Sequence, residues 1–152
     1  MTLDLTKDVP RSPFATLNGF VWLPRMIDKA RAFYAGTMGD YSAYPCPGDK
    51  QFLDFFGIDA QAIGTIIKDG ASDETITEYV AKQTSRTAAD KQAYALRQQN
   101  PPASLLHRVA LKVFRRKHRA KFQTLHPNLP FGRIDSFAKM IALEEGHPIL
   151  GL

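Results

Sequence analysis

Apolar residues recur along most of this chain at the three- and four-residue spacing of an amphipathic helix. The first such stretch begins at Pro24, a residue suited to the first turn of a helix, and runs to about Gly36. Its apolar stripe is Met26, Ile27, Ala30, Phe33 and Tyr34, and its polar side is Arg25, Asp28, Lys29 and Arg31. Because Asp28 stands three residues from both Arg25 and Arg31, we expect pairing on the helix surface.

Four shorter helices are predicted next by a repeated order of capping residue, apolar helix and helix-ending residue. The predicted caps are Asp49, Asp59, Ser72 and Thr87, and the helices end near Gly57, Gly70, the residues after Val80, and Asn100. Their inward residues are expected to be Phe52, Leu53, Phe55, Phe56, Ile63, Ile66, Ile67, Ile76, Tyr79 and Val80. We expect these phenylalanines to lie in the core, because apolar residues at helical spacing usually face inward.

A longer helix is predicted from Ala103 to about Phe122. Its expected core face is Leu106, Val109, Ala110, Val113 and Phe114, and its opposite face carries Arg108, Lys112, Arg115, Arg116 and Arg119. Asp135 is predicted to cap a final helix that carries Phe137, Met140, Ile141 and Leu143 and ends at Gly146.

These elements predict an all-α fold: a single compact bundle of about six or seven short helices with an extended N-terminal arm. The arm spans residues 1–23, where Phe20-Val21-Trp22-Leu23 is either a short strand or an apolar anchor. The whole chain, 1–152, is expected to form one domain, with a possible sub-division at Asn100-Pro101-Pro102.

Composition narrows the class of protein without naming a function. The 152 residues are 44% hydrophobic and 23% charged, which is typical of a globular domain. Cys46 is the only cysteine, so no intrachain disulfide can form and a reducing, cytoplasmic location is expected. Met1 to Asp8 lacks the apolar stretch of a secretion signal, and no apolar run approaches membrane-spanning length, so we expect no membrane partner.

Charge is distributed unevenly along the chain. Between Asp90 and Asp135 there are ten basic residues and no acidic one, whereas the remainder carries ten basic and fifteen acidic residues. This asymmetry predicts either an acidic surface elsewhere in the fold or a negatively charged partner. Nucleic acid is one candidate, although no helix-turn-helix, zinc-finger or RNA-recognition motif accompanies the basic helix.

A second candidate anion site lies near the N-terminus. Its residues are Arg11, Ser12, Arg25, Asp28, Lys29 and Arg31, which a polar arm beside a charged helix would bring together. Arginines in such a pocket would bind a carboxylate or phosphate through two parallel hydrogen bonds. The alternative is an arm that is ion-paired to the helix and only fastens the chain to the bundle.

No motif indicates catalysis, a metal or a cofactor. Nucleophile-elbow, phosphate-loop, dinucleotide and HExxH patterns are missing from the sequence. His107 and His118 would lie about 16 Å apart along a helix, too far to share an ion. Cys46 is either a reactive loop thiol or a buried spectator. An enzyme would therefore need an unrecognised helical site, with Asp28 or Asp49 as base and Arg25 as anion ligand.

The ordered motifs of the N-terminal half resemble a bacterial domain-of-unknown-function family, number 5069. The resemblance is carried by Leu3-Asp4-Leu5-Thr6, Pro10-Arg11-Ser12-Pro13, Leu23 to Ala32, Gly36-Thr37 and the segment from Asp49 to about Val80, with Arg133-Ile134-Asp135 and Glu144-Glu145-Gly146 near the C-terminus. It implies no known activity, cofactor or substrate. Family members often carry leucine where this chain has Gly48, so a role for this loop is not implied.

Three hypotheses for function follow from these patterns. The first is a non-catalytic helical module that binds an acidic protein surface or an anionic metabolite. The second is a nucleic-acid-associated protein that uses the basic helix, and the third is the helical enzyme around Arg25 and Asp28. The sequence alone leaves all three open.

Overall fold

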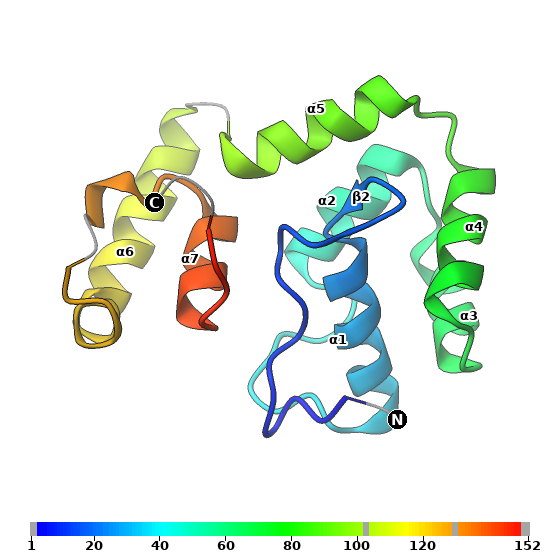
Figure 1. Cartoon of the computed structure of the whole chain (residues 1–152), viewed down its shortest axis with the longest axis horizontal. Helices are drawn as coiled ribbons and strands as arrows, with labels where there is room; N and C mark the ends of the chain where they lie inside the picture. Colours follow the sequence, from blue (N-terminus) through cyan, green and yellow to red (C-terminus); the bar gives the residue numbers. More distant parts are fainter. Residues whose placement is uncertain (1–2, 102–103, 129–130, 150–152) are drawn as a thin grey trace. The chain divides into compact units, whose positions relative to one another are not determined.

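The computed structural model describes residues 3–101, 104–128 and 131–149, and their fold is mostly helical, as predicted (Figure 1). Two short strands form the only sheet of this part of the chain. The elements, in order, are β1 (Thr16–Leu17), β2 (Phe20–Val21), α1 (Leu23–Ala35), α2 (Pro47–Phe56), α3 (Ala60–Lys68), α4 (Asp73–Gln83), α5 (Ala88–Gln99), α6 (Leu105–Leu125), the 3-10 helix η1 (Phe131–Arg133) and α7 (Phe137–Glu144).

The chain divides into two compact units, Met1–Gln92 and Ala93–Leu152, and the boundary lies within α5. The expectation that residues 1–152 form one domain stays a prediction. The division separates the charge: the first unit has ten basic and twelve acidic residues, and the second has ten basic and three acidic residues. The net charges are therefore −2 and +7, so the net positive charge of the protein comes from the second unit.

Helix α1 is the centre of the first unit. Leu23, Met26, Ile27 and Ala30 are fully buried, and α1 packs against α3 and β1. Beside it, the ring of Phe20 meets the rings of Phe52 and Phe56 edge-on at centroid distances of 6.3 and 5.1 Å. Phe52 and Phe56 are fully buried, as the periodicity of this segment predicted.

The helix starts follow the predicted capping chemistry in three of five places. Asp59 accepts a hydrogen bond from the Ala62 amide, and Ser72 accepts one from the Thr75 amide. The side chain of Asp90 accepts a hydrogen bond from the Thr87 amide, and the Thr87 hydroxyl accepts one from the Asp90 amide. This is the reciprocal arrangement of a capping box.

Two predicted caps are wrong. Helix α2 begins after Cys46, three residues before Asp49, because Pro47 and Gly48 form its first turn and Asp49 turns back to the Cys46 amide. Helix α7 begins after Ser136, whose hydroxyl accepts from the Lys139 amide, and Asp135 lies one residue earlier.

The lead-in contains a hairpin that ends at an unusual residue. β1 and β2 pair antiparallel around Asn18 and Gly19, both at positive φ, as a two-residue hairpin turn requires. Trp22 then precedes α1 with φ of 75°. For a bulky side chain this left-handed conformation is strained, so other contacts must hold Trp22 in place.

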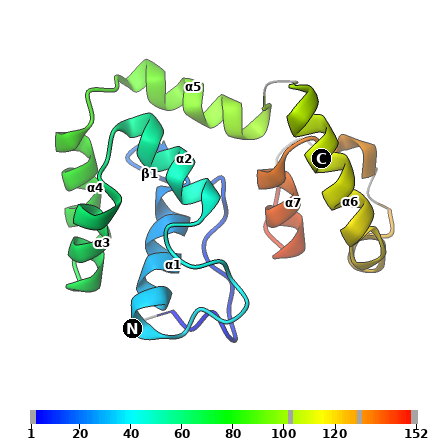
Figure 2. The ribbon, with the colours of Figure 1, turned by 180° about the vertical axis from the view of Figure 1, so that it is seen from behind.

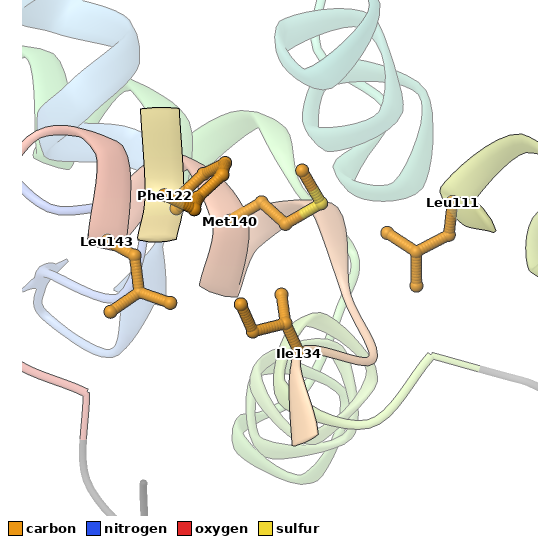
Figure 3. Packing of buried hydrophobic residues seen from close by; sticks show 5 residues of the cluster. All are labelled: Leu111, Phe122, Ile134, Met140 and Leu143. Carbon is orange, nitrogen blue, oxygen red and sulfur yellow. The ribbon is translucent and has the colours of Figure 1, made fainter. Parts of the chain in front are cut away.

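In the second unit, α6 and α7 lie side by side in both views (Figures 1 and 2). These two helices share a hydrophobic core with the segment after η1. Figure 3 shows this core, whose residues are Leu111, Phe122, Ile134, Met140 and Leu143. The core face predicted for α6 is confirmed at Phe114, which packs against this core, but it is wrong for Leu106, Val109 and Val113, which are 85%, 54% and 63% exposed. Helix α6 carries two apolar stripes, and α7 covers the one that contains Leu111 and Phe122.

No helix in the described part of the chain is both long enough and apolar enough to cross a membrane.

Candidate functional site

The N-terminal arm is joined to α1 by one arginine. Arg11 donates to Asp28 from its backbone amide (2.9 Å), from Nε (2.9 Å) and from Nη2 (2.8 Å). The two side-chain bonds form the parallel fork in which guanidinium groups bind carboxylates most strongly. Asp28 is 7% exposed, so the sequence-based expectation of pairing at the surface is wrong.

A second carboxylate completes this cluster from α4. Asp73 accepts a hydrogen bond from Arg11 Nη1 at 2.6 Å, and its other oxygen lies 2.8 Å from Arg31 Nη1. Arg31 also donates to the Ala71 carbonyl at 2.8 Å. The arm, α1 and the start of α4 are thus held together by residues that are 17 to 62 positions apart in the chain.

Arg25 is buried beneath the arm instead of facing solvent. Its guanidinium carbon lies 5.7 Å from the ring centroid of Trp22 and 6.0 Å from that of Tyr41, and Nη1 donates to the Arg11 carbonyl at 3.2 Å. Ser12 Oγ accepts from the Phe14 amide, so this hydroxyl shapes the turn of the arm. Of the predicted site residues, Arg11, Asp28 and Arg31 lie in one ion-paired cluster with Asp73, whereas the Lys29 ammonium lies against another carboxylate. Anion binding there stays a prediction, and an anion would have to displace these carboxylates.

A second ionic centre lies deeper in the same unit, around Asp49. This carboxylate is fully buried and accepts from Trp22 Nε1 at 3.0 Å and from the Cys46 amide at 2.9 Å. Lys29 Nζ, on a side chain that is 5% exposed, lies 3.5 Å from Asp49 Oδ2. The hydrogen bond to the indole restrains the side chain of Trp22, the residue whose backbone is left-handed. The three donors leave Asp49 poorly placed to act as a base on a ligand.

The importance of Trp22 was missed by sequence reasoning. Trp22 stands 27 residues before Asp49, and no local spacing links the two. One signal in the sequence could have indicated a buried polar partner. Trp22 and Lys29 stand among apolar residues, and buried indole and ammonium groups need a hydrogen-bond acceptor. Cys46, whose amide completes the centre, has a free and buried thiol, in agreement with the spectator alternative.

The basic face of α6 has a different environment from these two centres. Arg108, Lys112, Arg116 and Arg119 are exposed, and within the described residues their side chains have no hydrogen bond or ion pair. Arg115 differs from them because it is half-buried and donates to the Ile134 carbonyl at 3.0 Å. Four of the five predicted residues of this face therefore present free positive charge.

No metal centre is evident in the part of the chain that the structure describes, where no three histidine, cysteine or carboxylate side chains gather suitably. The class defined by these observations is a mostly helical protein with two internally neutralised ionic centres in one unit and an exposed cationic helix in the other. The chain belongs to the family described as domain of unknown function (DUF5069), whose model matches residues 7–147. No curated protein matches the chain.

The Arg11 cluster leads to a prediction about acid stability. Burial alone would raise the pKa of Asp73, but the hydrogen bond from Arg11 and the positive charges of Arg11 and Arg31 outweigh it and lower the pKa. Because this folded-state pKa lies below the unfolded value, the stabilisation is present above the unfolded pKa and is lost as the pH falls through the folded one. We expect Arg11→Ala to lower the free energy of unfolding at neutral pH by about 1–2 kcal/mol, since the pair is partly screened by solvent.

Arg11→Ala should also reduce the loss in the free energy of unfolding that the protein undergoes as the pH falls. Urea unfolding followed by circular dichroism at pH values from about 7 to about 3 would measure both effects. Lys68→Ala is the matched control, because this side chain is exposed and has no hydrogen bond or ion pair among the described residues. Curves for wild type and Arg11→Ala that stay parallel over this range would contradict the assigned role of Arg11.

Proposed function

We propose that this protein is a non-catalytic binding module that recognises an acidic protein surface through the exposed face of α6. The observation that carries the proposal is the set of four exposed, unpaired cations on that face, Arg108, Lys112, Arg116 and Arg119. They belong to the unit with a net charge of +7. A surface of this kind attracts acidic partners over a distance of about one Debye length and orients them.

The contrast with the first unit supports the choice of α6. There, Arg11 and Arg31 are already paired with Asp28 and Asp73, and Lys29 is buried against Asp49. Those contacts stabilise the fold, and they neutralise the positive charges of Arg11, Lys29 and Arg31 within the first unit. On α6 the charge is available to a partner, so binding there requires no rearrangement of the interior.

A protein partner fits this surface better than a nucleic acid does. Aliphatic side chains, among them Val109 and Val113, are exposed between the cations, and a phosphate backbone offers them no apolar contact. Single-stranded nucleic acids are usually bound with the help of aromatic rings that stack on bases. The phenylalanine rings described on α6 already have other contacts and are not free to stack on bases. Phe122 is buried, and Phe114 stacks on His118.

The proposal is tested by measuring binding to probes of equal negative charge. A fluorescent glutamate-rich peptide and labelled single- and double-stranded oligonucleotides would be titrated with the full chain at low and near-physiological salt. We expect the peptide to bind, with an affinity that falls as salt rises. Arg116→Glu with Arg119→Glu should weaken it by about tenfold, because each exposed ion pair contributes up to about 1 kcal/mol.

The matched control is Lys50→Glu with Lys68→Glu, two exposed lysines of the first unit. This variant has the same net charge as the α6 variant, so unchanged binding would show that position matters and not charge alone. Binding of the oligonucleotides tighter than that of the peptide would favour the nucleic-acid hypothesis instead. An equal loss of peptide binding in both double variants would overturn the assignment to α6.

A further inference from the structure

A row of aliphatic side chains on α6 faces away from the core of its own unit. Leu106, Val109 and Val113 are 85%, 54% and 63% exposed, whereas Leu111 and Phe122 of the same helix are buried against the α7 side. Large aliphatic residues scattered singly on a surface are ordinary. A contiguous set along one helix face, opposite the buried face, is instead typical of an interaction surface.

The spacing of this row is that of a helix–helix seam. Leu106, Val109 and Val113 are separated by three and then four residues, which places them at the a, d and a positions of a heptad, and Ala120 occupies the next a position. Arg116 at the intervening d position limits the apolar part to about two turns. In this register the buried Leu111 and Phe122 fall at f and c, so one helix uses two opposite faces.

Positive charge borders the seam on both sides. Lys112 and Arg119 occupy the g positions and Lys117 the e position, and all three are exposed with no partner among the described residues. Residues at e and g decide which helices pair across such a seam. Here they would require acidic residues from the partner.

The flanking charges argue against a second copy of this chain as the partner. In a parallel pair of α6 helices, Lys112 of one copy would face Lys117 of the other twice. In an antiparallel pair, Lys112 would face Arg119. Like charges in these positions disfavour association, so the surface fits a different helix.

We infer that the outward face of α6 is a docking seam for an amphipathic helix whose aliphatic stripe is bordered by glutamate or aspartate. This inference rests on the proposed function and adds to it the form of the partner. The aliphatic row supplies the apolar contact, and Lys112, Lys117 and Arg119 select acidic flanks. The occupant is a helix laid along α6 with its stripe on Leu106, Val109 and Val113.

The experiment uses the full chain and three synthetic peptides of about three heptads. The first has leucine at a and d and glutamate at e and g, the second has lysine at e and g, and the third has the composition of the first in an order without a stripe. Binding is measured by fluorescence anisotropy, and peptide helicity by circular dichroism. We expect the first peptide to bind, the second not to bind, and the third to bind only as weakly as a disordered acidic peptide.

Two variants separate the apolar and ionic contributions. The first is the triple variant Leu106→Ser, Val109→Ser and Val113→Ser. It should weaken binding of the first peptide by at least about tenfold and leave binding of the third peptide unchanged, because only the first peptide buries the aliphatic row. Since the three side chains are exposed, the fold should be retained, which circular dichroism would verify. Lys112→Glu with Arg119→Glu should reverse the preference, so that the lysine-flanked peptide binds better than the glutamate-flanked one.

The outcomes distinguish this inference from the function on which it rests. Equal binding of the first and third peptides, unaffected by the triple serine variant, would overturn the helical seam and leave acidic-partner binding intact. Binding of neither acidic peptide would overturn both. Self-association of the chain that the triple serine variant abolishes would overturn the choice of partner, since it would identify a second copy as the occupant.

Discussion

Replacing Asp49 by alanine is expected to lower the free energy of unfolding by about 3–5 kcal/mol, the largest effect of any single change considered for this chain. Asp49 is fully buried, and its two oxygens accept from the Trp22 indole, the Cys46 amide and the Lys29 ammonium. Its removal leaves a buried positive charge and two buried N–H groups without their partner. It also removes the hydrogen bond that restrains the indole of Trp22, whose backbone lies at positive φ.

Urea unfolding followed by far-ultraviolet circular dichroism measures this effect, since the fold is mostly helical. Asp54→Ala is the matched control, because it makes the same chemical change at an exposed position of the same helix, α2. We expect it to alter stability by less than about 0.5 kcal/mol.

A double variant tests the stated cause. Lys29→Met with Asp49→Ala removes the unpaired buried ammonium, so it should be more stable than Asp49→Ala alone. If Asp49→Ala and Asp54→Ala cost the same, the buried centre does not contribute as described.

The second large effect is expected at Gly48, where alanine should destabilise the protein by about 1–3 kcal/mol. A Cβ atom at this position would overlap Cζ2 of Trp22, well inside van der Waals contact. The indole has little room to move, because it is 5% exposed and hydrogen-bonded to Asp49. In an open helical position the same change would usually stabilise, since alanine is the better helix former.

Chemical denaturation of Gly48→Ala alone and in a Trp22→Phe background measures the clash. The smaller ring leaves space beside residue 48, so Gly48→Ala should cost less there, with a coupling energy of about 1 kcal/mol or more. Gly132→Ala is the control, since its added Cβ would meet nothing within 4 Å. Additive costs in the double variant would show that Trp22 is not the obstacle.

The short-range features of the fold were predictable because their causes are local. The caps at Asp59 and Ser72 act on amides three residues later, so the sequence displays both partners together. The two wrong caps show the limit of this reasoning. The helices α2 and α7 begin after Cys46, three residues before Asp49, and after Ser136, one residue after Asp135, so both carboxylates were assigned a role that a nearby residue holds.

The two ionic centres could not be predicted as such. The charges of Arg25, Asp28 and Lys29 were assigned to a solvent-facing side because charged residues are rarely buried without partners. Their partners, Arg11 and Asp49, are separated from them by 14 to 20 residues, so only the folded chain brings them together. The grouping of Arg11, Asp28 and Arg31 was therefore predictable, whereas the contribution of Asp73 and the separate pairing of Lys29 with Asp49 were not.

From the sequence it follows that the chain is helical, where most of its helices begin, and that residues 91–134 carry ten positive charges and no negative one. These properties depend on residue type and on spacing within a few turns. Which of the two apolar stripes of α6 is buried, and which charged side chains are ion-paired, follows only from the folded chain. Periodicity defines the faces of a helix, but burial and ion pairing depend on contacts between segments far apart in the chain.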